Sequence, residues 1–285
     1  MAENADTLIR FLLPDAHTRG AIIRGTHIIE EAKSMHGLSD MPAQMLGKTL
    51  LASILLLTAS KGGVRQVLQL DALPSQSQAP IRRILAEAKT GSVRGYLNWK
   101  EGAAIQRNPQ EEGISAWMGQ PLHISAVRDL GFGTPYISTI EYDSEYLADH
   151  IVHFLHQSAQ IRADMILQDD IAILLEAMPG CDDEHWFKAV STMAGISNGA
   201  LKHQQPEQLL QAFDALHVKI VGHDDYIYQC DCNAEKLSAA LLAITIDNLP
   251  ELADEHGNLT VSCQYCSNHY SVPLQDFMAK QNLSK

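Results

Sequence analysis

Four of the five cysteines lie close together near the end of the 285-residue chain. Cys230 and Cys232 form a C-x-C pair, and after thirty intervening residues Cys263 and Cys266 form a C-x-x-C pair. Four cysteine thiolates complete the tetrahedral coordination of Zn²⁺, and paired short spacings seldom arise among cysteines that are buried separately in a core. The pattern therefore predicts one Zn²⁺ per chain, held by these four residues in their reduced state.

The residues around the second pair predict a hairpin. We expect residues 259–262 and 269–272 to form two short strands with the C-x-x-C at their tip, where two intervening residues let the backbone turn. Such a turn aims both sulfurs at one point.

The first pair needs a different geometry. In an extended segment Cys230 and Cys232 lie on the same side. They precede a helix that Asn233 can cap and that we expect to end near Ile244, and its amino-terminal end favours thiolate charge. A second short helix is expected to begin at Asn248-Leu249-Pro250 and to end at Gly257.

Residues 230–285 are too few to build a strong hydrophobic core. Structural zinc contributes about 10–16 kcal/mol in small metal-folded peptides, as much as the ~5–15 kcal/mol stability of a whole domain. The metal therefore decides whether this module folds. Oxidants convert thiolates through sulfenic acid to disulfides, which do not hold the ion as thiolates do, so oxidation is expected to unfold the module.

The first two-thirds of the chain mix helix and strand signals without a repeat, which predicts an α+β core domain over residues 1–179. Pro179-Gly180 marks its end. Expected strands or extended segments cover residues 18–26, 64–70, 93–99 and 173–178, with a hairpin of 122–127 and 136–142. Expected helices cover residues 27–36, 42–59, 80–89 and 146–156.

Residues 180–229 predict a metastable helical linker. Helical pieces such as 206–216 are separated by Gly195, Gly199 and the polar stretch 203–206. An ordinary interdomain connector fits the same residues equally well. The chain then divides into a core domain (1–179), a linker (180–229) and a zinc-binding module (230–285).

Composition restricts the class of protein. With 46% apolar and 19% charged residues and a net charge of −13, a folded protein that does not bind nucleic acid is expected. The longest apolar stretch, 50–57, is too short for a bilayer and predicts a buried helix. The acidic residues among the first six do not fit a secretory signal, so we expect a cytoplasmic protein without a permanent disulfide framework.

The cysteine spacing and the following Asn268-His269-Tyr270 resemble the heat-shock protein 33 family of redox-regulated bacterial holdase chaperones. Weaker similarities are Arg19-Gly20, the Val93–Tyr96 segment, Ser158-Ala159-Gln160 and the segment from Leu174 to Gly180. The chain departs from the family at Ile171-Ala172, where Gly-Gly is usual. It also departs at Glu176, where Gln is usual, and at Ala159, where Glu is usual. These departures concern the packing, the surface and the dimerisation of the core.

The resemblance implies a switch. Reduced and zinc-bound, such a protein is inactive. Once oxidised, with disulfides Cys230–Cys232 and Cys263–Cys266, it releases zinc and unfolds its linker. It then forms a homodimer and binds unfolding or oxidatively damaged client proteins. Burial of apolar surface is non-directional, so client binding needs little sequence specificity.

Two other functions fit the cysteines less well. A zinc-ribbon nucleic-acid module is disfavoured because the residues from Cys230 onward carry three lysines against seven acidic residues. A thiol–disulfide oxidoreductase using Cys263 and Cys266 needs the attacking cysteine at a helix start. No phosphate-binding loop or nucleophile elbow occurs in the sequence, so we assign no catalytic residue and expect independence from ATP.

Two more residues are of types that could serve in a metal or redox site. His269 is interpreted as a non-ligand because four cysteines already complete the metal site. Cys181 precedes Asp182, Asp183 and Glu184, whose negative charge is expected to raise the pKa of its thiol, so it is interpreted as a bystander.

Overall fold

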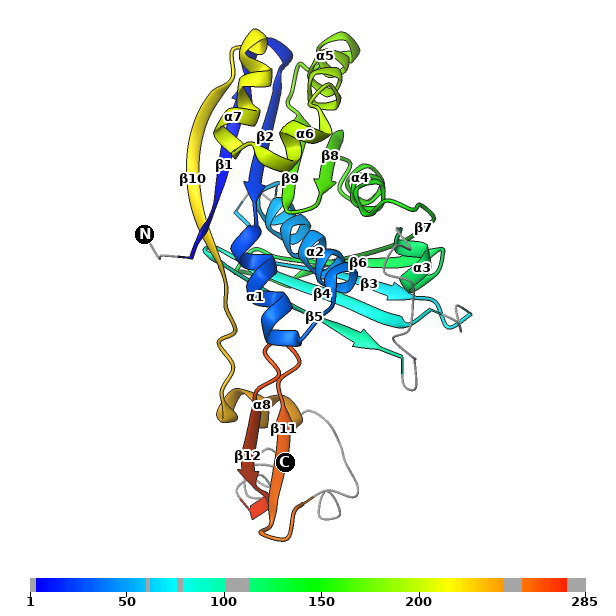
Figure 1. Cartoon of the computed structure of the whole chain (residues 1–285), viewed down its shortest axis with the longest axis vertical. Helices are drawn as coiled ribbons and strands as arrows, with labels where there is room; N and C mark the ends of the chain where they lie inside the picture. Colours follow the sequence, from blue (N-terminus) through cyan, green and yellow to red (C-terminus); the bar gives the residue numbers. More distant parts are fainter. Residues whose placement is uncertain (1–3, 60–61, 76–78, 101–112, 243–252, 276–285) are drawn as a thin grey trace. The chain divides into compact units, whose positions relative to one another are not determined.

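The computed structural model describes residues 4–59, 62–75, 79–100, 113–242 and 253–275. Two compact units divide the chain, Met1–Tyr228 and Gln229–Lys285. Both contain helices and strands, which confirms the predicted α+β class (Figure 1).

The first unit contains a ten-stranded sheet of order β7-β6-β3-β4-β5-β10-β1-β2-β9-β8. All neighbours are antiparallel except β5 and β10, which pair in parallel over two residues each. Two antiparallel halves therefore meet at β10. The strands are β1 (Asp6–Leu13), β2 (Thr18–Arg24), β3 (Arg65–Ala72), β4 (Ile81–Lys89), β5 (Ser92–Trp99), β6 (Leu122–Asp129), β7 (Tyr136–Tyr142), β8 (Ala163–Gln168), β9 (Ile171–Ala177) and β10 (Lys219–Tyr228).

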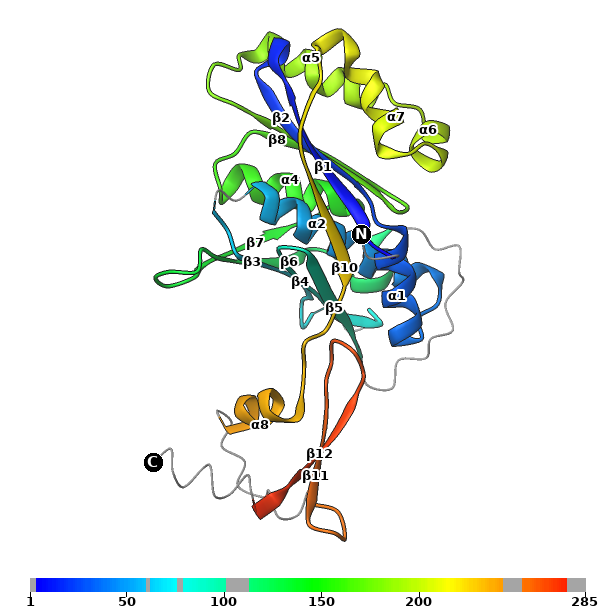
Figure 2. The ribbon, with the colours of Figure 1, turned by 90° about the vertical axis from the view of Figure 1, so that its left-hand side faces the viewer.

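Helix α2 (Asp40–Ala59) lies between the two halves of the sheet and contacts strands of both (Figures 1 and 2). Its length and composition would allow it to cross a membrane, but 78% of its most apolar window is buried inside the protein. It is the core helix that the sequence predicts. The predicted helix before it is α1 (Thr26–His36), which ends at Gly37 with a left-handed φ of 58°.

The helix predicted over residues 80–89 is wrong, because this segment forms strand β4 between β3 and β5. Ala, Leu, Glu, Lys and Arg favour a helix locally. Ladder pairing on both edges, together with burial of five consecutive residues from Ile84 to Ala88, outweighs that preference. Two more α-helices lie within the described part of residues 1–179, α3 (Ile114–Met118) and α4 (Leu147–Gln157). Helix α4 matches the helix predicted there.

Residues 180–229 are helical in their first part. They form α5 (Asp183–Ala194), α6 (Asn198–His203), α7 (Pro206–Leu210) and the 3-10 helix η2 (Gln211–Leu216). Strand β10 follows and was not predicted. Seven apolar side chains of the helical part join a second hydrophobic core over β1, β2 and β9: Ala189, Met193, Leu201, Leu209, Leu210, Phe213 and Leu216.

The second unit contains α8 (Ala234–Leu242) and the antiparallel strands β11 (Asn258–Ser262) and β12 (His269–Pro273). The predicted hairpin and the Asn233 cap are confirmed, since the Asn233 side chain accepts a 2.8 Å hydrogen bond from the Lys236 backbone. The helix predicted from Asn248 lies outside the described residues.

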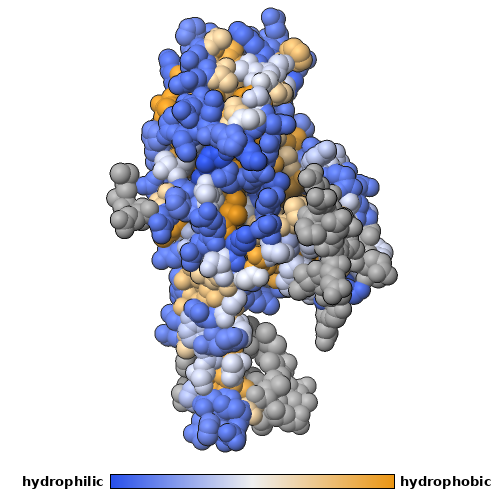
Figure 3. Space-filling view, in the orientation of Figure 1, coloured by the Kyte–Doolittle hydropathy of each residue, from blue (hydrophilic) through white to orange (hydrophobic). Residues whose placement is uncertain are grey.

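Several large exposed apolar side chains of the first unit gather at the β6–β7 turn, where Tyr136 and Ile137 are 60% and 67% exposed beside Phe132. Phe132, Tyr146 and Phe187 are each more than 70% exposed, and they lie in the β6–β7 turn, before α4 and in α5. On the face drawn in Figure 3 the surface is mostly hydrophilic, with small apolar patches.

Candidate metal centre

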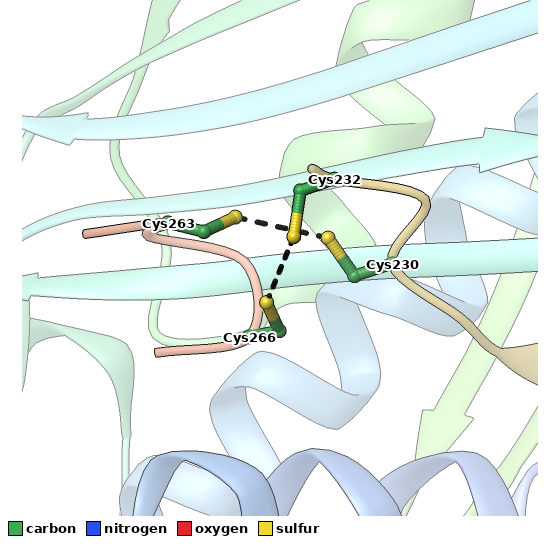
Figure 4. A group of neighbouring side chains, drawn as sticks. All are labelled: Cys230, Cys232, Cys263 and Cys266. Carbon is green, nitrogen blue, oxygen red and sulfur yellow. Dashed lines mark hydrogen bonds between the residues drawn. The ribbon is translucent and has the colours of Figure 1, made fainter. Parts of the chain in front are cut away.

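The four cysteines of the C-x-C and C-x-x-C pairs meet in the second unit. Their Sγ atoms all lie within 4.8 Å of one another. Cys230 Sγ is 3.7 Å from Cys263 Sγ, and Cys232 Sγ is 3.2 Å from Cys266 Sγ (Figure 4). Side chains 33 and 34 positions apart in the chain thus point at one centre, and the structure brings together the whole set that the sequence selects.

The hairpin turn positions Cys263 and Cys266, which are both buried. The Cys263 backbone N–H donates to the Asn268 carbonyl at 2.9 Å, and the Ser267 N–H donates to the Cys263 carbonyl at 2.8 Å. Ser267 takes a left-handed φ of 57°, which turns the backbone into β12. These contacts fix the direction of both sulfurs.

Cys230 and Cys232 lie in an irregular segment between β10 and α8 rather than in a regular strand. Lys236 anchors this segment, because its Nζ donates to the Asp231 carbonyl oxygen at 2.7 Å and to the Asp231 carboxylate at 2.8 Å. Both sulfurs point toward the hairpin (Figure 4).

The donor set fits a zinc ion. Tetrahedral coordination with Zn–S bonds of about 2.3 Å separates the sulfurs by roughly 3.8 Å. The contact between Cys230 and Cys263 matches this separation, and the one between Cys232 and Cys266 is about half an ångström shorter. Four soft sulfur donors in this arrangement favour zinc over hard cations, which prefer oxygen ligands.

Tyr270 of β12 touches the cluster as well. Its hydroxyl lies 3.2 Å from Cys232 Sγ and donates a 3.3 Å hydrogen bond to the Cys232 carbonyl. Burial raises the pKa of Cys232, but bonds from Tyr270 and the neighbouring thiols outweigh it and lower that pKa to about 7. Burial raises the pKa of both Cys230 and Cys266. Cys232 is therefore the most acidic of these three thiols.

In the sequence, Tyr270 stands out only as part of the Asn268-His269-Tyr270 resemblance. Strand alternation could have placed it, because His269 and Tyr270 must point to opposite faces of β12. The Nδ1 atom of His269 instead forms a 2.7 Å hydrogen bond with Ser262 Oγ.

Cys181 belongs to the first unit, beside the N-terminus of α5, and is not part of the cluster. The pKa of its thiol is raised, chiefly by burial and then by Asp182 and Asp183, against the opposing charge of Arg162. The predicted direction is confirmed, but burial contributes more than the acidic neighbours.

The C-x-x-C occupies a turn between two strands, not the start of a helix. It lacks the helix N-terminus that lowers the pKa of an attacking thiol in oxidoreductases.

Two departures from the family pattern have defined places in the core. Glu176 on β9 is buried and pairs with Arg19 of β2 at 2.8 Å. Ala159, just after α4, is exposed and lines a cavity.

Comparisons with known proteins agree with this architecture. The family profile described as "Hsp33 protein" matches residues 6–273. The 33 kDa chaperonin of Trichodesmium erythraeum is 29% identical over 94% of this chain and 90% of its own. The 33 kDa chaperonin of Geobacter sulfurreducens is 24% identical over 95% of this chain and 93% of its own.

A crystal structure of the 33 kDa chaperonin from Thermotoga maritima has the same fold. It superposes with a TM-score of 0.77 at 21% identity and covers 99% of both chains. Because the family profile spans both the sheet and the cysteine cluster, the chain belongs to the Hsp33 family.

Proposed function

We propose that this chain is a redox-regulated, ATP-independent holdase chaperone whose switch is Cys230, Cys232, Cys263 and Cys266. The observation that carries the proposal is the convergence of their four Sγ atoms within 4.8 Å. Its relatives are named chaperonins, and the proposed activity is client binding without catalysis.

In the reduced state the four thiolates hold one zinc ion. Bound zinc supplies a cross-link between the C-x-C segment and the hairpin. The second unit needs this cross-link because its described side chains form a very small core. Only five of them are buried: Ser238, Leu259, Cys263, Cys266 and Val272.

Oxidation removes the thiolates. Each disulfide forms from two thiols with loss of two protons and two electrons, and one molecule of peroxide accepts both to give two waters. The nearest sulfur contacts join the two segments, so the geometry leaves the pairing open. We propose Cys230–Cys232 and Cys263–Cys266. Mass-spectrometric mapping of the oxidised protein decides between these and crossed pairs.

Loss of the second unit's fold then frees residues 180–229, which we propose act as a metastable linker between a core domain (1–179) and the switch module (230–285). The seven apolar side chains that this segment buries on β1, β2 and β9 become available with the strand faces beneath them. Together they provide apolar surface for unfolding client proteins and for a homodimer. We place this activity in the cytoplasm, where thiols stay reduced until an oxidant arrives.

An aggregation assay tests the proposal. The full-length zinc-loaded protein is compared before and after treatment with peroxide and mild heat, without ATP, for suppression of an unrelated protein's thermal aggregation. Suppression should appear only after oxidation and should survive Cys181→Ser, the matched control outside the cluster. Equal suppression before and after oxidation, or its loss with Cys181→Ser alone, contradicts the assignment. Turnover of insulin disulfides would favour a thiol–disulfide oxidoreductase. Retention of DNA on filters at low salt would favour a nucleic-acid-binding module.

A further inference from the structure

Three polar side chains form a row across neighbouring strands of the first unit. Gln66 of β3 pairs with Arg128 of β6, and Arg128 pairs with Tyr136 of β7. Directly paired residues in antiparallel strands project from the same face of a sheet. The row is therefore a fixed feature of the register.

A cavity of about 260 Å³ lies over this row. Its floor includes Ala126, which lies two residues before Arg128 on β6. Because side chains alternate along a strand, Ala126 projects from the same face as Arg128. Its remaining walls come from the ends of α2 and α4 and the residues that follow α4: Leu56, Ala59, Phe154, Leu155, Ser158, Ala159 and Ile161. Tyr136 and Ala159 are exposed and stand at its mouth. The cavity is thus mostly apolar, with one cation in its wall.

The guanidinium of Arg128 is incompletely bonded. Its Nε atom is buried and has no hydrogen-bond partner among the described residues. Arg65 of β3 and Arg83 of β4 differ, since Arg65 pairs with Glu87 at 3.0 Å and Arg83 pairs with Asp71 at 2.5 Å. The amide oxygen of Gln66 does not accept from the unpartnered Nε of Arg128, and the amide nitrogen of Gln66 donates to the Val67 carbonyl. A buried cationic donor without a partner is costly unless something fills its place.

We propose that this cavity binds a small organic carboxylate with an apolar body. A guanidinium holds a carboxylate through parallel N–H···O bonds, which satisfies the buried Nε. The apolar walls then bury the rest of the ligand. Such a carboxylate can belong to a free medium-chain acid or to the C-terminus of an extended apolar peptide. The site uses no cysteine and is independent of the proposed redox switch.

Calorimetric titration of the full-length, reduced, zinc-loaded protein tests the charge requirement. Octanoate is compared with octanol, and N-acetyl-Leu-Leu with its C-terminal amide. Both carboxylates should bind at least about tenfold more tightly than their neutral partners, because a hydrogen bond to a charged group is lost without the carboxylate. Binding of only octanoate assigns the site to free acids, and binding of only the peptide assigns it to chain termini. Equal binding of the charged and neutral probes overturns the proposal.

Two substitutions test the location. Arg128→Met should weaken octanoate binding at least about tenfold, whereas Arg82→Met, which removes an exposed arginine on β4, should leave it unchanged. Ala159→Glu adds a carboxylate at the mouth of the cavity and should compete with octanoate. Because Ala159 is exposed, this variant keeps the test available if Arg128→Met fails to fold. Wild-type affinity in Ala159→Glu, or in a folded Arg128→Met, rules out this site.

Discussion

Arg24 on β2 donates a 2.5 Å hydrogen bond to the carbonyl oxygen of Leu201 in α6. The same guanidinium donates to the Gln204 carbonyl at 2.8 Å and pairs with Asp170, and its side chain is only 10% exposed. Carbonyls at the end of a helix lack partners within the helix, and a cation there also favours the helix dipole. One arginine of the core thus anchors the segment that we propose to be the linker.

Replacing Arg24 should loosen α6. Arg24→Met removes both carbonyl contacts and the ion pair with Asp170, whose carboxylate keeps its hydrogen bond from Thr26. We therefore expect a loss of about 1–3 kcal/mol in the free energy that holds this segment. Hydrogen exchange of residues 198–204 should become faster. The matched control is Arg82→Met, at an exposed arginine of β4. Exchange equally slow in Arg24→Met and wild type contradicts the anchoring role.

Phe213 should stabilise the segment from its apolar side. It is fully buried in η2, with its ring centroid 5.7 Å from that of Phe11. Phe213→Ala leaves a cavity in the second core and should cost about 3–5 kcal/mol in the free energy of unfolding. Denaturant unfolding measures the loss. Phe187→Ala, at a side chain 73% exposed, should change stability little. Similar losses in both variants would show that the segment does not pack as described.

His150 should make the first unit sensitive to acid. Burial lowers the pKa of this fully buried imidazole against opposing hydrogen bonds and charges, so the folded protein keeps it neutral. Below its usual pKa of about 6.5 the unfolded chain binds a proton that the folded chain does not. The contribution of the neutral His150 to the free energy of unfolding should therefore be fully present above that pH and should decrease as the pH drops below it.

The measurement is urea unfolding at intervals from pH 7.5 to pH 5 for wild type and two variants. His150→Phe should lose less stability over this range than wild type does. His123→Gln, at an exposed imidazole beside Glu141, serves as the control for other titrating groups. If His150→Phe keeps the full wild-type pH dependence, the imidazole of His150 does not cause the acid sensitivity and the prediction is wrong.

Tyr270 should tune the metal site without being a ligand. Tyr270→Phe removes the hydroxyl that lies 3.2 Å from Cys232 Sγ. Mutation of a group that hydrogen-bonds a metal ligand, without itself binding the metal, typically costs 10- to 100-fold in metal affinity. We therefore expect a loss of about this size in zinc affinity. Competition with a chromogenic chelator measures it, and Tyr146→Phe, at an exposed tyrosine of the first unit, is the control. Unchanged affinity in Tyr270→Phe would make the contact incidental.

The sequence predicts the convergence of the four cysteines well because its information is local. Cysteine spacing selects the four donors, and the residues flanking Cys263 and Cys266 specify the hairpin that aims two of them. The position of Tyr270 against Cys232 depends on how the C-x-C segment docks on the hairpin. That relation spans thirty-eight residues and has no local signal.

The core is predicted less completely, since its errors come from long-range pairing. Strand β4 carries helix-forming residues and becomes a strand only between β3 and β5. Strand β10 is half exposed, and its register comes from β1, more than two hundred residues earlier in the chain. The cavity beside Arg128 likewise appears only when three strands align Gln66, Arg128 and Tyr136.

Zinc content tests the central claim most directly. Elemental analysis of the full-length protein, purified under reducing conditions, should find one zinc per chain. After peroxide treatment and removal of small molecules the zinc should be gone, and replacement of Cys230, Cys232, Cys263 and Cys266 by serine should abolish it, while Cys181→Ser keeps it. A reduced protein without zinc, or an oxidised one that retains it while binding clients, would contradict the proposed switch.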